Sequence, residues 1–350
     1  MFFCLDEDVD FFNYCLSRLQ IPFTRCASPK NATVLLHTAH PWDSSWIKRA
    51  EQAIPQAQKV VVVTTELHPP IVEWLSNLDE SVDVYTCGWI HNLRAKQYFY
   101  MDWFATTTHL YKQKPYLLAK AAKTDTSTVR FNALLGRKKP HRDLVYNFLK
   151  DRTDTVCTYL QTKMGTIDPS SFNDPTKFLW ECEQQPVDWT IDRVEYEGEQ
   201  VSLSQIIPLQ IYTDTDWCIV AETNYQTEFA FFTEKTAKPI LAKKPFIMVG
   251  NPHSLRTLHR LGFKTFDSVI DESYDNSFDL EKRVGMAMTQ VDRLANLTET
   301  ERSSLNEKIR PILEHNQTIM LETNWQLLRQ ESLQYCLDLT ICLNNCILGK

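Results

Sequence analysis

Apolar residues along this chain recur in two patterns that alternate. Short runs rich in Val, Ile and Leu have the length of buried parallel strands, and between them apolar residues recur three and four positions apart, as in amphipathic helices. Near the amino terminus this pattern predicts helices over 9–19, 46–54 and 71–75, and strands over 33–37, 59–64 and 82–85. Strands that alternate with helices are typical of a parallel sheet covered by helices.

The same alternation resumes after residues 120–128, a polar stretch without periodicity that we interpret as a linker. It predicts strands over 129–135, 218–221 and 245–249, and helices over 141–149, from Thr233 onward, and over 253–261. From residue 280 to residue 343 the spacing is helical, with a cap expected around Thr298. We therefore expect an α/β protein with Rossmann-like domains over 1–122 and 123–290, and helices over 291–350.

Composition and charge narrow the partners that this chain can have. Of its 350 residues, 43% are apolar and 23% are charged, which is typical of a soluble globular protein. The formal net charge of -7 disfavours DNA as a partner, because non-specific binding to nucleic acid requires Lys and Arg side chains that neutralise phosphates. A small anionic ligand suits the basic middle of the chain better than a polymer does.

Several features bear on metals and on location. The 10 cysteines lack the spacing of a metal site, and Asp214 and Asp216 have only the isolated Asp-x-Asp spacing, so we expect no metal. No stretch reaches the roughly 20 apolar residues of a membrane span. The acidic amino terminus does not match a signal peptide. We therefore expect a cytoplasmic protein without a membrane span.

Polar residues crowd at one end of the strand–helix–strand unit over 217–250. Glu222 and Asn224 follow the first strand, and Thr233, Glu234 and Lys235 begin the helix. Ligands of open α/β sheets bind at the carboxyl ends of the strands, and a helix start with free N–H groups beside a lysine suits a diphosphate. The alternative is an ordinary cap, a carboxylate that complements the helix dipole, and a solvated charge.

A second basic helix start follows the strand over 129–135. Its loop contains Arg137, and the helix that begins at His141 contains Arg142. A basic loop is often simply solvated. We nevertheless expect the helix starts at His141 and Thr233 to converge on one negatively charged group, because both follow strands of the same sheet.

Carboxylates for general-base catalysis are expected in the first domain. Asp43 and Glu66 lie in loops that follow predicted strands, and each is close to a histidine in sequence. A carboxylate in a partly dry site can accept the proton of an acceptor hydroxyl. The alternative for Asp43 is an N-cap of the helix that follows.

The central unit also resembles a known motif. The order Glu-x-Asn, an aromatic pair, Thr-Glu-Lys and then Pro-Phe-Ile-x-x-Gly, over residues 222–250, is similar to the donor-binding motif of the α-1,3-fucosyltransferase family. Phe231 stands where the family has Tyr, and Lys238 where the family has a small or apolar residue. Residues 262–275 resemble related viral and bacterial glycosyltransferases.

The resemblance implies a fold and a set of roles. The fold is GT-B, in which two Rossmann-like domains face each other and a terminal helix often crosses back to the first domain, which is the path implied for residues 291–350. In the family, the Glu and Lys of Thr-Glu-Lys hold the ribose and diphosphate of the donor, which places these roles on Glu234 and Lys235. An Arg in the helix after an earlier strand binds the donor phosphates, which points to Arg142 first and Arg137 next.

We therefore predict a glycosyltransferase that moves a sugar from a nucleoside diphosphate sugar to a carbohydrate or other hydroxyl acceptor, with inversion and without metal or cofactor. The expected donor-binding residues are Lys235, Glu234, Thr233, Asn224, Glu222, Arg142 and Arg137, and the expected catalytic bases are Glu66 and Asp43. One alternative is a viral enzyme that glycosylates a hydroxymethylpyrimidine in DNA and acts in the host cytoplasm. The other is a non-catalytic protein that binds nucleotide sugars.

Overall fold

The computed structural model describes residues 1–18, 23–38, 44–64, 67–99, 101–121, 129–160, 193–226 and 229–325. Within these ranges the chain forms two compact units. The first contains Met1–Asp102 together with Asn324 and Trp325, and the second contains Trp103–Thr323. Both units contain a parallel sheet with helices, so the chain is a mixed α/β protein. The linker expected over 120–128 lies mostly outside the described residues.

The first unit is built on a parallel sheet whose strand order follows the chain. The strands are β1 (Phe2–Cys4), β2 (Thr33–Thr38), β3 (Lys59–Thr64), β4 (Val82–Thr86), β5 (Gly88–Ile90) and β6 (Lys96–Phe99). The helices are α1 (Val9–Arg18), α2 (Ser44–Ala53) and α3 (Pro69–Ser76). The five-stranded sheet has the order β1-β2-β3-β4-β6 with parallel pairs. The valine run in β3 is buried, as its β-branched composition predicts.

The second unit contains a parallel four-stranded sheet of order β13-β11-β7-β8. Its strands and those outside the sheet are β7 (Phe131–Arg137), β8 (Thr155–Leu160), β9 (Arg193–Tyr196), β10 (Glu199–Ser202), β11 (Trp217–Ala221), β12 (Phe229–Phe231) and β13 (Phe246–Val249). Its helices are α4 (Asp102–Gln113), which begins at the unit boundary, α5 (Pro115–Ala121), α6 (Pro140–Leu149), α8 (Leu209–Asp214), α9 (Glu234–Leu241), α10 (Ser254–Arg260), α11 (Leu280–Ala295) and α12 (Glu299–Glu322). The short helix η5 (Ser273–Asn276) precedes α11.

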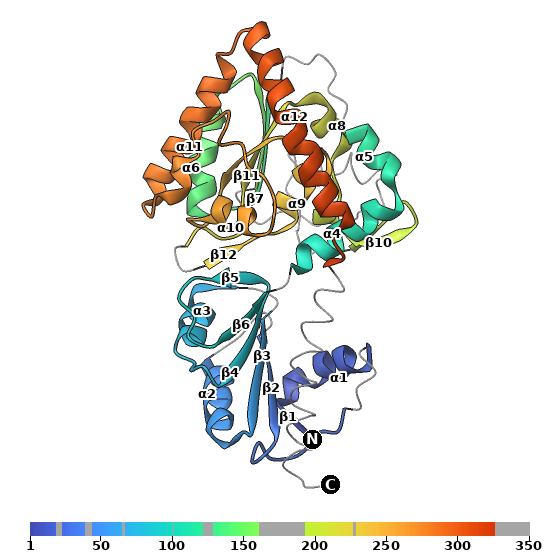
Figure 1. Cartoon of the computed structure of the whole chain (residues 1–350), viewed down its shortest axis with the longest axis vertical. Coiled ribbons are helices and arrows are strands. Elements are labelled where there is room, and N and C mark those ends of the chain that lie inside the picture. Colours follow the sequence, from blue (N-terminus) through green and yellow to red (C-terminus); the bar gives the residue numbers. More distant parts are fainter. Residues whose placement is uncertain are drawn as a thin grey trace. The chain divides into compact units, whose positions relative to one another are not determined.

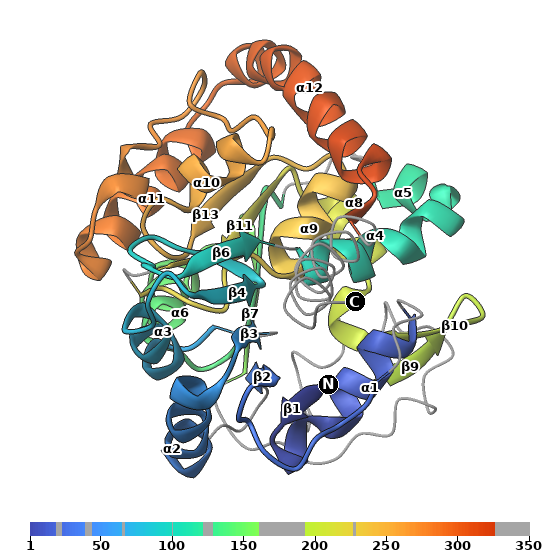
Figure 2. The same ribbon diagram turned by 60° about the horizontal axis from the view of Figure 1, so that its bottom comes forward.

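Helices cover both faces of the second sheet. Figures 1 and 2 show α6 and α11 on one side of β7 and β11, with α9 and α12 on the other side. This arrangement follows from the strand order. The chain moves from β7 to β8 in one direction and from β11 to β13 in the other, and right-handed crossovers then place α6 and α9 on opposite faces.

Several local signals in the sequence are confirmed. Thr298 and Glu301 form a capping box at the start of α12. Gly262 follows α10 with a φ of +89°, the left-handed conformation that favours glycine after a helix. Helix α9 continues through Pro239 to Leu241. Helices α4 and α5 are not among the elements that the apolar pattern predicts.

The carboxyl-terminal part of the chain is described as far as Trp325. Helices α11 and α12 confirm the helical spacing predicted from residue 280 onward. The predicted return of later helices to the first domain concerns residues outside the described part. None of the helices in the described ranges combines the length and the apolar character that crossing a bilayer requires.

Candidate functional site

The carboxyl ends of β7 and β11 mark the point where the strand order of the second sheet reverses. From β7 the chain continues through α6 to β8, and from β11 it continues through α9 to β13. The loops that follow the two strands therefore lead away in opposite directions. Open α/β sheets bind their ligands at such a point. The polar and basic residues singled out in the sequence follow these same two strands.

Glu222, the first residue after β11, holds the start of α9 with its buried carboxylate. Its Oε1 accepts a hydrogen bond from the backbone N–H of Thr233 at 3.0 Å and another from the hydroxyl of Thr236. Its Oε2 accepts from the hydroxyl of Thr233 at 2.8 Å and from the backbone N–H of Thr223 at 3.0 Å. Both oxygens are therefore used inside the protein. Glu222 joins the strand end to the helix start.

Two lysines reach Thr223 from the two helix starts. Lys139, the residue before α6, donates from Nζ to the carbonyl oxygen of Thr223 at 2.6 Å. Lys235, in the first turn of α9, has its Nζ 3.4 Å from the hydroxyl of Thr223. The side chain of Lys235 is 21% exposed, and Lys139 and Thr223 are also partly exposed. These groups form the part of the site that a ligand from solvent can reach.

His141 and Arg142 lie behind this surface, in the buried first turn of α6. Nε2 of His141 lies 2.7 Å from the carbonyl oxygen of Glu222, so this nitrogen is the one that donates a proton. Nη2 of Arg142 donates to the same carbonyl at 3.2 Å. Gly136 has a φ of +61°, and a Cβ there would stand 3.6 Å from Nη1 of Arg142. Both helix starts thus converge on Glu222 and Thr223.

The charges around α9 favour an anion. Nζ of Lys235 donates to Oε1 of Glu234 at 2.6 Å. Burial acts to raise the pKa of Glu234, but the ammonium groups of Lys235 and Lys238 outweigh it and hold that pKa below its ordinary value. Burial lowers the pKa of Lys238 to about 8. The charged side chains at and near the two helix starts include Lys138, Lys139, Arg142, Lys235 and Lys238 against Asp143, Glu222 and Glu234, so positive charge predominates.

The remaining sequence-predicted residues are distributed as follows. Asn224 is buried two residues after the carboxylate that anchors α9. Arg137 ends β7, and the structure describes only its backbone. The expected catalytic bases, Asp43 and Glu66, lie outside the described residues. Asp216 precedes β11 and therefore lies at the opposite edge of the sheet from the convergence of the helix starts.

Lys139 was not assigned to the site from the sequence, although its contact with Thr223 places it there. The sequence does contain a signal that points to Lys139. Pro140 is the first residue of α6, and proline is favoured at that position because its missing N–H has no partner there in any case. The residue before such a proline lies at the helix start, and in this chain it is a lysine at the edge where ligands bind.

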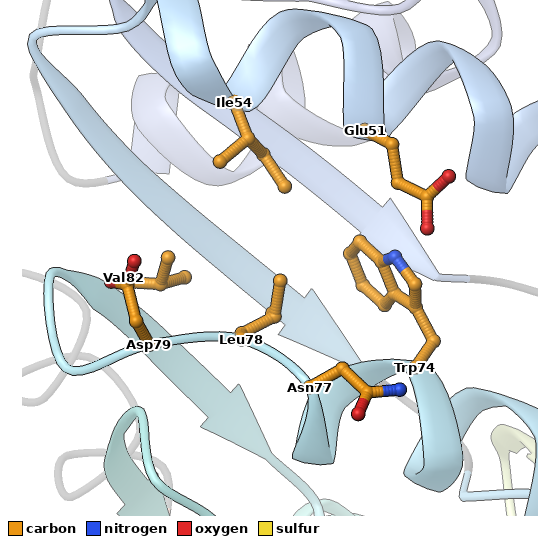
Figure 3. Close-up of a pocket in the computed structure, with 7 residues that line it drawn as sticks. All are labelled: Glu51, Ile54, Trp74, Asn77, Leu78, Asp79 and Val82. Atoms are coloured by element: carbon orange, nitrogen blue, oxygen red, sulfur yellow. The ribbon is translucent and has the colours of Figure 1, made fainter.

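A pocket of about 210 Å³ lies elsewhere, in the first unit. It is lined by Glu51, Ile54, Trp74, Asn77, Leu78, Asp79 and Val82 (Figure 3). These residues come from the carboxyl end of α2 and the residue after it, from the carboxyl end of α3 and the loop after it, and from the start of β4, so the pocket lies at the amino ends of the strands. Its charged lining residues are both acidic, which disfavours an anionic ligand.

Comparisons with known proteins add little to this geometry. No family model matches the chain, and no curated protein matches it. A solved structure described as "Crystal Structure of alpha1,3-Fucosyltransferase" is similar with a TM-score of 0.28 and 12% identity, over 82% of this chain and 92% of that one. A likeness with this TM-score supports no argument about fold or function.

Replacement of Glu222 by Ala should destabilise the second unit strongly. The change leaves the buried N–H group of Thr233 and the partly buried N–H group of Thr223 without their acceptor, and we expect the free energy of unfolding to fall by about 3 kcal/mol. Denaturant unfolding measures this loss. Glu314→Ala, an exposed acid on α12, is the matched control and should change stability by less than about 0.5 kcal/mol. Equal stability of the two variants would contradict the anchoring role.

His141 should make stability depend on pH. Burial lowers its pKa from 6.5 to about 3, and the charge of Arg142 acts in the same direction. Between these values the unfolded chain binds a proton that the folded protein does not bind. The contribution of His141 to the free energy of unfolding therefore falls as the pH falls through this window, by up to about 1.4 kcal/mol per pH unit.

The variant His141→Gln should show a shallower pH dependence, because its amide keeps a donor for Glu222 but does not titrate. The measurement is the free energy of unfolding of both proteins by denaturant, from about pH 6.5 down to about pH 4.5. We expect the wild-type protein to lose stability faster than the variant over this range. Parallel curves would show that His141 is not the neutral buried ring described above.

Proposed function

We propose that this protein is a glycosyltransferase that moves a sugar from a nucleoside diphosphate sugar to a hydroxyl acceptor. The observation that carries the proposal is the convergence of Lys139 and Lys235 on Thr223, at the point where the strand order reverses. Two partly exposed ammonium groups at such a point suit the two phosphates of a diphosphate. The proposal includes the GT-B fold and the inverting, metal-independent reaction that the motif resemblance implies.

The proposed chemistry uses cations where other transferases use a metal. As the bond between the sugar and the diphosphate breaks, negative charge develops on the leaving diphosphate, and fixed positive groups stabilise that charge more strongly in the transition state than in the ground state. Lys235 and Lys139 would contact the phosphates. Arg142 would act from behind, because it is buried against the carbonyl of Glu222.

The remaining donor-binding roles form part of the same proposal. Glu234 would hold the ribose, while Glu222 would position the start of α9 rather than touch the donor. Inversion requires a base that accepts the proton of the acceptor hydroxyl as that oxygen attacks the anomeric carbon from the opposite side. Asp43 and Glu66 are the proposed bases. The acceptor is a carbohydrate or another hydroxyl compound.

Binding and turnover together test the proposal. Thermal unfolding is followed with GDP, UDP, ADP, CMP and dTDP, and release of the nucleoside diphosphate is followed with the matching nucleotide sugars. A transferase should be stabilised by one nucleoside diphosphate and should release it slowly from the sugar donor. Stabilisation without release from any donor would support a non-catalytic binder instead. If none of the nucleotides stabilises the protein, the proposed nucleotide-binding site is wrong.

Replacement of either lysine should slow turnover far more than it changes the fold. With Lys235→Ala or Lys139→Ala we expect the activation free energy to rise by about 2–4 kcal/mol, and kcat to fall accordingly, because each ammonium group is proposed to contact the leaving group. Lys138→Ala is the matched control, since the side chain of Lys138 is 64% exposed and pairs with Asp143. Steady-state rates with the donor identified above measure the effect. A Lys235→Ala protein with normal kcat would refute this assignment.

A further inference from the structure

The loop between η5 and α11 exposes an aromatic side chain. Among the residues that the structure describes, the exposed large apolar side chains are Met1, Tyr116 and Phe278. Tyr116 uses its hydroxyl in a hydrogen bond to Glu197. Phe278 is 60% exposed and has no polar atom that would benefit from water. An exposed Phe ring costs free energy that contact with a ligand would recover.

The ring of His253 packs against the ring of Phe278, and the backbone of His253 has an uncommon conformation. The two ring centroids lie 5.4 Å apart at an interplanar angle of 79°. His253 has a φ of +63°, in the left-handed region that is uncommon for residues other than glycine. Such backbone outliers cluster at sites that bind ligands, where the surrounding structure holds them. His253 follows β13, so this pair of rings lies at the carboxyl edge of the second sheet.

The start of α10, which follows His253, is already occupied by the protein. The carboxylate of Asp275 accepts hydrogen bonds from the backbone N–H groups of Leu255 at 3.1 Å and Arg256 at 3.2 Å. The N–H of His253 donates to the carbonyl oxygen of Asp275 at 2.8 Å. This helix start therefore offers no free donors to an anion. The exposed side chains at this end of the edge include Arg256, in the first turn of α10, and the ring of Phe278.

Arg283 fixes this aromatic end relative to the lysines. It is buried in α11, and it donates from Nη1 to the carbonyl of Ser277 at 2.5 Å and from Nη2 to the carbonyl of Tyr225 at 2.8 Å. Ser277 precedes Phe278, and Tyr225 lies two residues after Thr223. The Tyr225 ring also contacts the ring of His141, with centroids 4.8 Å apart. One buried guanidinium thus joins the loop of Phe278 to the loop that the lysines contact.

We propose that Phe278 and His253 form a stacking subsite for the planar base of a nucleotide whose phosphates contact Lys139 and Lys235. The proposal rests on the function proposed above and adds the part of the donor that it leaves unplaced. Stacking on an aromatic ring accepts every base, since each has a π face. The subsite would therefore supply affinity, and polar groups nearby would select the base.

The subsite is tested by comparing the affinity for ligands that have a base with the affinity for a ligand that has none. Isothermal titration measures the affinity of the full chain for inorganic pyrophosphate and for GDP, UDP and ADP. With Phe278→Ala we expect about tenfold weaker binding of the preferred nucleoside diphosphate and unchanged binding of pyrophosphate, because only the former has a base. Phe278→Trp should restore the affinity. Tyr116→Ala, which removes an exposed aromatic ring elsewhere in the same unit, should change neither affinity.

The outcomes separate this subsite from the function on which it rests. If Lys235→Ala weakens both ligands while Phe278→Ala binds the nucleotide as the wild type does, the subsite is wrong and the phosphate site stands. If Phe278→Ala weakens pyrophosphate as much as the nucleotide, its effect is indirect and the subsite is again wrong. If the wild-type protein binds neither pyrophosphate nor a nucleoside diphosphate, both the proposed function and the subsite are wrong.

Discussion

The hydrogen bonds of the Glu222 carboxylate determine what the strand edge of the second unit can offer to a ligand. They place a buried negative charge at the start of α9 and join this start to the end of β11. A carboxylate in this position complements the helix dipole. At the helix start itself, the N–H of Lys235 donates to the hydroxyl of Thr233 at 3.4 Å, and the N–H of Thr236 donates to the carbonyl oxygen of Thr233 at 3.1 Å. These two N–H groups are therefore used inside the protein, and the accessible positive charge is that of Lys235 and Lys139 rather than the free N–H groups that the sequence predicts.

The two helices that meet at this edge lie on opposite faces of their sheet. Their first turns nevertheless converge, because each follows one of two neighbouring strands, and all carboxyl ends of a parallel sheet lie at the same edge. Arg142 and Lys139 approach from the β7 side, and Lys235 approaches from the β11 side. The convergence is therefore a consequence of the strand order, which places β7 beside β11 and leads the chain away in opposite directions.

Much of this architecture could be predicted from sequence, because it depends on local patterns. The valine run of β3, the cap at Thr298 and the glycine at 262 each specify their own element within a few residues. The site is different. Glu222 and Thr233 are 11 residues apart, and Glu222 and Arg142 are 80 apart, so their contacts depend on the pairing of strands that local periodicity does not specify. For the same reason the burial of Arg142 and the contribution of Lys139 emerge only from the structure.

The basic groups of α6 are anchored to main-chain oxygens. Lys139 donates to the carbonyl of Thr223, while His141 and Arg142 donate to the carbonyl of Glu222. Every amino acid supplies a carbonyl, so these anchors tolerate drift in the side chain at position 223 as long as β11 keeps its path. Of the contacts that Lys139 and Lys235 make with Thr223, that of Lys235 uses the hydroxyl. A substitution at position 223 during evolution could therefore change the contacts of Lys235 while Lys139, His141 and Arg142 keep theirs.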